Sequence, residues 1–249
     1  MTSWDRYWKL VYALDPAARS PFDLFADRVV GSARGCWLDA GCGRRSLPEW
    51  RTDEFRGLRA RGIVLVGCDA DLAALAERQD PGLVCGATLD DLPYRDASFD
   101  FVSANMVFEH LANPPAVVRE LARVTRPGGR ILVHTVNGLH YLSWVARCTP
   151  HRFHQWIVER VERRAGKDVY PTQYRANTVR RLQRLFEGNG CRFVEGGLVD
   201  GIPLYLPYRG FLEIAIRVGF LERRLARLPG LGRFLLPNLL MEFERTSVA

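Results

Sequence analysis

Residues 36–43, Cys-Trp-Leu-Asp-Ala-Gly-Cys-Gly, decide how this sequence is expected to fold. The apolar run that ends at Asp39 predicts a short buried strand, and Gly41 and Gly43 predict a tight turn directly after it. Residues without a side chain let the backbone approach a ligand closely. Open α/β sheets bind ligands at the carboxyl ends of their strands, where this turn would lie. We therefore expect a ligand site beside Asp39.

Further apolar stretches predict the other strands of a sheet. Strands that alternate with helices, and that are continuously apolar, are typical of a parallel sheet covered on both faces. We predict an α/β, Rossmann-like fold with seven mostly parallel strands and helices on both faces. Beyond the first strand, strands are expected at 63–71, 83–87, 98–105, 130–136, 191–200 and 237–246, helices at 71–79 and 114–126, and a turn at 126–129.

Composition excludes several classes of protein. The 249 residues are 47% hydrophobic and 25% charged, which does not fit disorder, collagen-like repeats or coiled coil. No apolar run reaches the roughly 18 residues of a membrane span, and the first ten residues lack the apolar core of a signal peptide. The six cysteines form no C-x-x-C pair, so we expect reduced core residues in a cytoplasmic protein.

Basic residues concentrate in one part of the chain. The net charge is +7, and residues 140–184 alone hold ten Arg and Lys against three Asp and Glu. Two helices expected at 151–165 and 177–188 carry most of these charges. Their basic faces are either ordinary solvated surface or a surface for an anionic partner, such as a substrate phosphate, an acidic lipid surface or RNA.

The glycine turn and four further stretches together resemble the class I S-adenosylmethionine-dependent methyltransferases. Asp39, Gly41 and Gly43 match the family's D-x-G-x-G pattern. Asp69 ends the second strand, as does the family's ribose-binding acid. Three further stretches resemble the family's segments around the fourth and fifth strands, namely residues 89–100, 105–114 and 123–133.

This resemblance covers about residues 34–136 and departs from the family pattern at two positions. Arg45 stands where a third glycine is frequent, and Thr88 where an acid is frequent. We expect one domain over residues 1–249. Its expected parts are an N-terminal helical segment (1–33), a cofactor-binding core (34–136), a basic helical cap (137–190) and the last two strands (191–249) with an apolar insert (202–237) between them.

The resemblance implies S-adenosyl-L-methionine as the cofactor. A carboxylate suits the ribose, because it accepts two hydrogen bonds from a diol. Some relatives bind a metal through Glu-x-x-Glu-His, but Met106 replaces the first Glu, so no metal site is expected. The implied cofactor-binding residues are Asp39, Gly41, Cys42 and Gly43 at the methionine end, Asp69 and Ala70 at the ribose, Thr88 and Leu89 at the adenine, and Asn105 and Met106 near the sulfonium.

Methyl transfer from a sulfonium is an in-line displacement, so the main task of the protein is to hold the reactants in line. A hydroxyl acceptor also needs a general base, and His110 is the candidate, because histidine titrates near neutrality. The alternative for His110 is a packed or helix-starting residue. Contact with the acceptor is also open for His140, Tyr141, Tyr174 and Arg175, although the last two would equally pin the following helix.

Within the apolar insert, residues 210–228 predict a helix that is apolar around most of its circumference. Its polar residues, Glu213, Arg217, Arg224 and Arg227, form a narrow stripe. A helix of this kind is usually buried or lies in an interface. The insert is therefore either a lid over the acceptor pocket, a dimer face, or a peripheral membrane contact.

Taken together, these patterns predict an enzyme that methylates a small-molecule or lipid-linked acceptor, at oxygen. The alternatives are an RNA methyltransferase that uses the basic surface, a nonenzymatic binding protein with an altered cofactor site, and a nicotinamide-dependent oxidoreductase. Against RNA, Asn105 is not followed by the Pro-Pro-aromatic run of base-nitrogen methyltransferases. Against a dinucleotide, Ser46 replaces the third glycine of the fingerprint.

Overall fold

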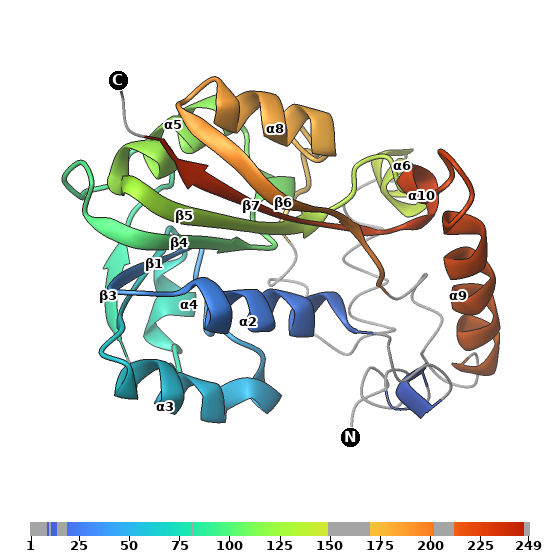
Figure 1. The fold of residues 1–249 in the computed structure, drawn as a ribbon, viewed down its shortest axis with the longest axis horizontal. Helices are drawn as coiled ribbons and strands as arrows, with labels where there is room; N and C mark the ends of the chain where they lie inside the picture. Colours follow the sequence, from blue (N-terminus) through green and yellow to red (C-terminus); the bar gives the residue numbers. More distant parts are fainter. Residues whose placement is uncertain are drawn as a thin grey trace.

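Seven strands form one sheet in the order β3-β2-β1-β4-β5-β7-β6 (Figure 1). The computed structural model describes residues 9, 11–13, 19–80, 82–148, 170–201 and 212–246. Neighbouring strands are parallel, except that β7 runs antiparallel to β5 and β6. The predicted mostly parallel sheet is confirmed. Its strands are β1 (Cys36–Ala40), β2 (Val64–Asp69), β3 (Leu83–Gly86), β4 (Phe99–Asn105), β5 (Thr125–Val136), β6 (Cys191–Val199) and β7 (Asn238–Arg245).

Helices cover both faces of this sheet, and a third group lies beyond its end. On one face lie α2 (Pro21–Ser32) and α3 (Thr52–Ala60), and on the other lie α5 (Pro114–Val124) and α8 (Val179–Glu187) (Figure 1). Beyond the carboxyl ends of β4 and β5 lie α6 (Tyr141–Cys148), α9 (Leu212–Ala226) and α10 (Gly232–Leu235). The short elements are η1 (Glu49–Arg51), α4 (Leu72–Ala76) and η2 (Phe108–His110).

The two faces of the sheet bury separate cores, because side chains alternate along each strand. Leu38 and Val102 belong to the cluster under α5 and α8. Trp37 and Phe101 belong to the cluster under α2 and α3, with Phe25 of α2. Asp39 comes two residues after Trp37 in β1, so its side chain points to the same face of the sheet, which α2 covers.

Helix ends follow local sequence signals. Thr178 caps α8 by accepting a hydrogen bond from the Arg181 N–H, a role for which threonine is well suited. Pro114 is the first residue of α5, where a missing N–H does no harm, and Asn113 caps this helix.

Some expectations about these elements were wrong. β3 is exposed rather than buried, with Leu83 at 66% and Val84 at 49%, because it lies at the edge of the sheet. Residues 126–129 are part of β5 rather than a turn, and the register between β4 and β5 shifts there. The helix expected at 71–79 is only α4, and α6 was not predicted. The helix expected at 151–165 lies outside the described residues.

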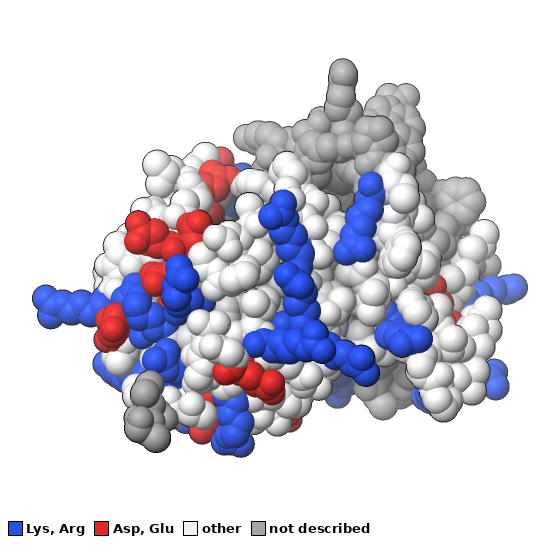
Figure 2. All heavy atoms as spheres, turned by 90° about the horizontal axis from the view of Figure 1, so that it is seen from above, with Lys and Arg blue, Asp and Glu red and all other residues white. Residues whose placement is uncertain are grey.

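The surface over α8 is basic. Arg180, Arg181 and Arg184 are exposed, and no ion pair is seen for them within the described ranges. In the view from above, basic side chains gather over the middle of the face, whereas acidic side chains lie mostly toward one end (Figure 2). The basic character expected for residues 177–188 is therefore on the surface.

All six cysteines are free thiols. Five are buried or half-buried, as expected for core residues, and Cys148 is exposed. Within the ranges that the structure describes, no helix is long and apolar enough to cross a bilayer.

Candidate active site

The carboxyl ends of β2, β1 and β4 lie side by side and bring the predicted site residues to one edge. The register pairs Ala40 with Cys68 and Asp39 with Ser103, so these three strands end at about the same level. Ala87 N–H donates to the Asp69 carbonyl (3.1 Å), which places the end of β3 at the same edge. This edge is where open α/β sheets bind ligands.

The glycine turn folds back over the end of β2. The Gly41 and Cys42 N–H groups both donate to the Cys68 carbonyl (2.7 and 3.1 Å). Gly41 has φ +74°, and a Cβ there would lie 2.4 Å from Val107 Cγ2, so only glycine fits. A Cβ on Gly43 would meet nothing within 4 Å, so the turn is open on that side.

Arg78 holds this turn in place, which sequence reasoning missed. Its Nη1 donates to the Cys42 and Gly43 carbonyls (3.1 and 3.2 Å), and its Nη2 donates to Ser46 Oγ (2.6 Å). The side chain is only 3% exposed, with Asp80 at 3.7 Å. No sequence pattern marked this arginine, because its partners lie more than 30 residues away in the chain.

Arg45, at the position of the missing third glycine, turns away from the site. Its guanidinium contacts Gln79 and lies 3.8 Å from Glu49. The next residue, Ser46, donates its N–H to Asp80. The turn is thus held by the segment 77–80 rather than by a third glycine.

Asp39 is a buried carboxylate with one unused oxygen. Its Oδ1 accepts a hydrogen bond from Ser103 Oγ (2.9 Å), which in turn accepts one from Trp37 Nε1 (2.8 Å). Its Oδ2 is buried and has no hydrogen-bond partner in the described part of the chain. Burial raises the pKa of Asp39 to about 6, against the opposing effects of Ser46, Arg78 and Ser103. A cation or an N–H donor at Oδ2 would offset the cost of burying the charged carboxylate.

Asp69, at the end of β2, is tied to the glycine turn. Its Oδ2 accepts from the Gly43 N–H (2.8 Å), and its Oδ1 accepts from the Asp71 N–H (2.9 Å). Each carboxylate oxygen has a second lone pair, and the residue is only half-buried. Asp69 can therefore accept two further hydrogen bonds from a ligand. The neighbouring Ala70 is exposed.

The end of β3 carries the residues expected at the adenine. Thr88 is exposed, whereas the Leu89 side chain is buried in the core under α5. Only the hydroxyl of Thr88 and the backbone of Leu89 are thus in a position to contact a ligand, and their role stays a prediction.

β4 ends in a strained turn at Asn105 and Met106. Met106 has φ +56°, which is uncommon for a residue other than glycine, and its N–H donates to the His134 carbonyl (2.8 Å). The His134 Nδ1 lies 2.7 Å from Asn105 Oδ1, and burial lowers the His134 pKa to about 3. His134 is therefore a neutral core residue that orients Asn105, with the amide NH₂ left for another acceptor. Backbone strain of this kind gathers at functional sites.

His110 follows this turn, in η2, and is half-buried. Its Nδ1 lies 3.0 Å from the Pro171 carbonyl oxygen. A carbonyl only accepts, so Nδ1 carries the proton and Nε2 of the neutral ring keeps its lone pair. Glu109 Oε1 lies 3.9 Å from Nε2. The tautomer of His110 is compatible with the expected role of a base, which stays a prediction.

Glu109 lies in a buried polar chain that sequence reasoning also missed. Its Oε2 accepts from Thr135 Oγ1 (2.7 Å), and Thr135 Oγ1 accepts from Asn177 Nδ2 (2.8 Å). All three residues are at most 3% exposed. Burial raises the pKa of Glu109, against the opposing effects of His110 and Thr135. The Glu-His pair was visible in the sequence, but the burial of Glu109 and its hydrogen-bond partners were not.

Residues 170–175, here called the strap, connect the end of β2 with the end of β4. Tyr170 Oη donates to Asp71, and its ring lies edge-on to His110 at 5.8 Å. The Gln173 and Tyr174 N–H groups donate to the Glu109 carbonyl (2.6 and 3.1 Å). The strap therefore links the two ends of the site.

The other acceptor-side candidates are placed differently. Arg175, the last residue of the strap, donates to the Ala112 carbonyl (2.8 Å). His140 is 1% exposed, and Tyr141 Oη donates to Glu222 of α9 (2.6 Å). Neither His140 nor Tyr141 has a described contact with His110.

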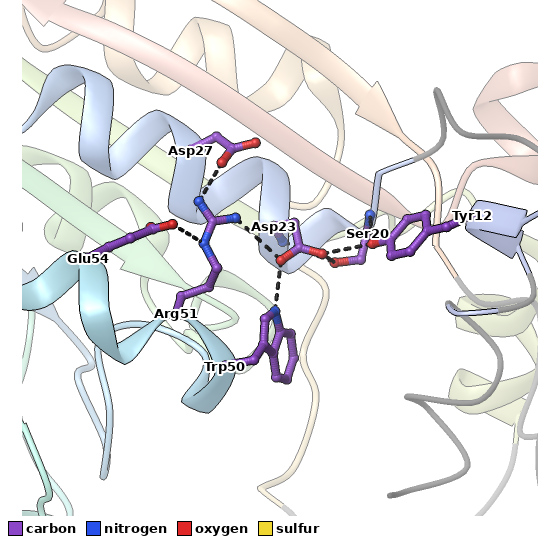
Figure 3. A network of polar contacts seen from close by, with 7 residues as sticks. All are labelled: Tyr12, Ser20, Asp23, Asp27, Trp50, Arg51 and Glu54. Carbon is purple, nitrogen blue, oxygen red and sulfur yellow. Dashed lines mark hydrogen bonds and ion pairs between the residues drawn. The ribbon is translucent and has the colours of Figure 1, made fainter.

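A polar network anchors the N-terminal segment next to this edge. Figure 3 shows Asp23 of α2 at its centre, reached by Tyr12, Ser20, Trp50 and Arg51. Burial raises the pKa of Asp23, but the hydrogen bonds from Ser20, Trp50 and Tyr12 outweigh it, and the net shift is downward. The network joins residues 11–13 to η1, which follows the glycine turn. Of the predicted N-terminal helical segment before residue 19, only residues 9 and 11–13 are described, and Val11 is buried.

Metal-ligating residues do not gather at this edge. Among the described residues, no group of three or more His, Cys, Asp and Glu side chains could hold a metal ion.

Comparison with known proteins identifies the family. The sequence profile of the methyltransferase domain family matches residues 38–133. A ubiquinone biosynthesis O-methyltransferase of Idiomarina loihiensis is 31% identical over 168 residues, which are 61% of this chain and 67% of that protein. A demethylmenaquinone methyltransferase of Mycobacterium tuberculosis is 48% identical over 62 residues, 25% of this chain and 26% of that protein.

Solved structures agree in fold. The YcgJ protein of Bacillus subtilis superposes with a TM-score of 0.54 at 15% identity, covering 91% of this chain and 98% of that one. The chain spans 54% to 67% of the length of three ubiquinone biosynthesis O-methyltransferases that it matches. On profile, relatives and fold, this chain belongs to the class I S-adenosylmethionine-dependent methyltransferase family, in which S-adenosylmethionine is the methyl donor.

Proposed function

We propose that this chain transfers the methyl group of S-adenosylmethionine to an oxygen atom of a small-molecule or lipid-linked acceptor. One observation carries the proposal. The same sheet edge holds Asp39 with an unused buried oxygen, Asp69 with free lone pairs, and His110 with an available Nε2.

The residues at this edge fit the methyl donor. Asp39 Oδ2 lacks a donor, and the ammonium of the methionine end would supply one. Gly43 leaves open space beside it, and Asp69 would accept both ribose hydroxyls. When bound, S-adenosylmethionine supplies an electrophilic methyl group on a sulfonium. The adenine would lie at Thr88 and Leu89.

Asn105 and Met106 would lie near the sulfonium. Asn105 is oriented by His134, which burial keeps neutral, so its amide stays fixed at every pH near neutrality. The positive φ of Met106 directs the backbone away from the strand at this point. A rigid turn here would keep the methyl group in line with the acceptor.

His110 would act as the general base. As the acceptor oxygen bonds to the methyl carbon, the bond from that carbon to the sulfonium sulfur would break and leave a neutral thioether, and the hydroxyl proton would pass to His110 Nε2. The Pro171 carbonyl holds Nδ1–H, so the ring stays in the tautomer with Nε2 free. Glu109, with Oε1 at 3.9 Å, would stabilise the imidazolium that forms.

The relatives support the acceptor class. Two proteins that are similar in sequence to this chain are named for ubiquinone biosynthesis and for demethylmenaquinone. Quinones are lipid-like, and the ring hydroxyls of their reduced forms and phenolic precursors are oxygen nucleophiles. The apolar helix α9, joined to α6 by the hydrogen bond between Tyr141 and Glu222, is consistent with an acceptor of this kind.

A methyl-transfer assay tests the proposal. Radiolabelled S-adenosylmethionine would be incubated with phenols, catechols and alcohols, each with and without a prenyl chain. His110→Gln is expected to lower kcat for the preferred acceptor by about 10²–10⁴-fold, the usual contribution of a general base, with cofactor affinity unchanged. Gln173→Ala, a strap residue whose backbone alone is used, is the control. Full kcat in His110→Gln, or product methylated at carbon, would contradict the proposal.

A further inference from the structure

The outer face of α9 and α10 is both apolar and basic. Ile214, Leu221, Leu225 and Leu228 are between 37% and 57% exposed. Positions 214, 217, 221 and 225, and likewise 217, 221 and 224, follow one another at intervals of three or four residues, so they share one face of α9. Leu228 lies just beyond the end of this helix at Ala226. Leu231 (39%) and Phe234 (38%) continue this face into α10.

No acidic partner is described for the arginines of this region. Arg217 and Arg224 of α9, and Arg227 directly after it, are exposed, and the described residues form no ion pair with them. Arg233 lies over the Phe234 ring, at 4.7 Å, rather than against a carboxylate. The right-hand end of the molecule in Figure 2, where α9 and α10 lie, is mostly uncharged with separate basic side chains.

The acidic side chains described near α9 are turned inward and anchor it. Glu222 accepts from Tyr141 Oη of α6 (2.6 Å), and Asp200 pairs with Arg223 at 2.7 Å. Asn137, directly after β5, donates to the Arg233 and Leu236 carbonyls (both 2.8 Å). The exposed face is therefore fixed to the same end of the sheet as the active site.

We propose that this α9–α10 face docks on an anionic lipid bilayer. Exposed leucines beside exposed arginines suit a bilayer surface, because the leucines can enter the apolar layer while the arginines contact the negatively charged headgroups. A second copy of the chain fits less well, since a two-fold contact through this face would set the arginines of both copies against one another. The proposal deepens the proposed function, since it places a lipid-linked acceptor at the site.

Vesicle flotation of the whole chain tests the docking. Vesicles of phosphatidylcholine with 30% phosphatidylglycerol are compared with phosphatidylcholine alone. Each basic residue near an anionic surface contributes about fivefold, so the triple variant Arg217→Gln, Arg224→Gln and Arg227→Gln is expected to bind the anionic vesicles roughly 100-fold more weakly. The double variant Leu221→Ser and Leu228→Ser is expected to lose binding as well.

The matched control removes three charges elsewhere. Arg180→Gln, Arg181→Gln and Arg184→Gln, on α8, are expected to reduce binding by less than about fivefold. An equal loss of vesicle binding in both triple variants would show that net charge alone attracts the chain to the vesicles, and it would overturn the proposal. So would an absence of flotation in a folded wild-type chain, or a dimer that Leu221→Ser dissociates. Flotation needs neither cofactor nor acceptor, so its failure and failure of methyl transfer are separate results.

Discussion

Arginine side chains are buried in the corner formed by the glycine turn, residues 41–43, but exposed on the α9–α10 face. In the corner, Arg78 is almost fully buried, and its guanidinium is used by two carbonyls, a hydroxyl and Asp80. On α9 and directly after it, Arg217, Arg224 and Arg227 are exposed near leucines. A buried cation with several partners shapes a fixed pocket for a small ligand, whereas exposed cations for which no acidic partner is described suit a broad charged surface.

The largest expected effect is on the buried side of this comparison. Arg78→Ala would leave Asp80 and Asp39 without a counter-charge and free the glycine turn. Loss of one partner from a buried ion pair costs about 3–5 kcal/mol. We expect a decrease of that size in the free energy of unfolding, measured by urea denaturation.

Arg56→Ala is the control for this change. Arg56 pairs with Asp53 on α3, but both side chains are more than 80% exposed. An exposed pair contributes about 1 kcal/mol or less. Equal destabilisation by the two substitutions would show that Arg78 does not hold the turn.

A smaller effect is expected where the strap meets the site. Tyr170→Phe removes the hydroxyl that donates to Asp71 and keeps the ring beside His110. One hydrogen bond at an exposed carboxylate is worth little, so we expect release of S-adenosylmethionine to become about two- to fivefold faster, with an unchanged melting temperature. Stopped-flow displacement measures this rate, and Gln173→Ala should leave it unaltered. An unchanged release rate in Tyr170→Phe would mean that the hydrogen bond between Tyr170 and Asp71 does not help to retain the cofactor.

The sequence sufficed for the parts of the molecule that local patterns determine. Continuous apolar strands, the glycine turn and the Thr178 cap each depend on residues close together in the chain. The residues found only in the structure depend on contacts between distant segments. Tyr170 and Asp71 lie 99 residues apart, and Glu109 and Thr135 lie 26 apart.

The exposure of β3 escaped prediction for a related reason. Leu83 and Val84 are as apolar as residues of a central strand, and only the strand order places them at the edge. The outer face of α9 was left open between lid, dimer face and membrane contact, since composition does not say which side of a helix is covered.

The most direct test of the account is calorimetric titration of S-adenosylmethionine at pH 6 and pH 8, in buffers of different ionisation enthalpy. Burial holds the Asp39 pKa near 6 in the free protein, and a cation at Oδ2 would lower it. Binding at pH 6 is therefore expected to release protons and to be weaker than at pH 8, where Asp39 is already ionised. In Asp39→Asn, affinity should fall and this proton release should vanish, whereas the surface variant Asp53→Asn should match the wild type. Equal affinity and equal proton release in wild type and Asp39→Asn would contradict the claim that Asp39 holds the methionine end.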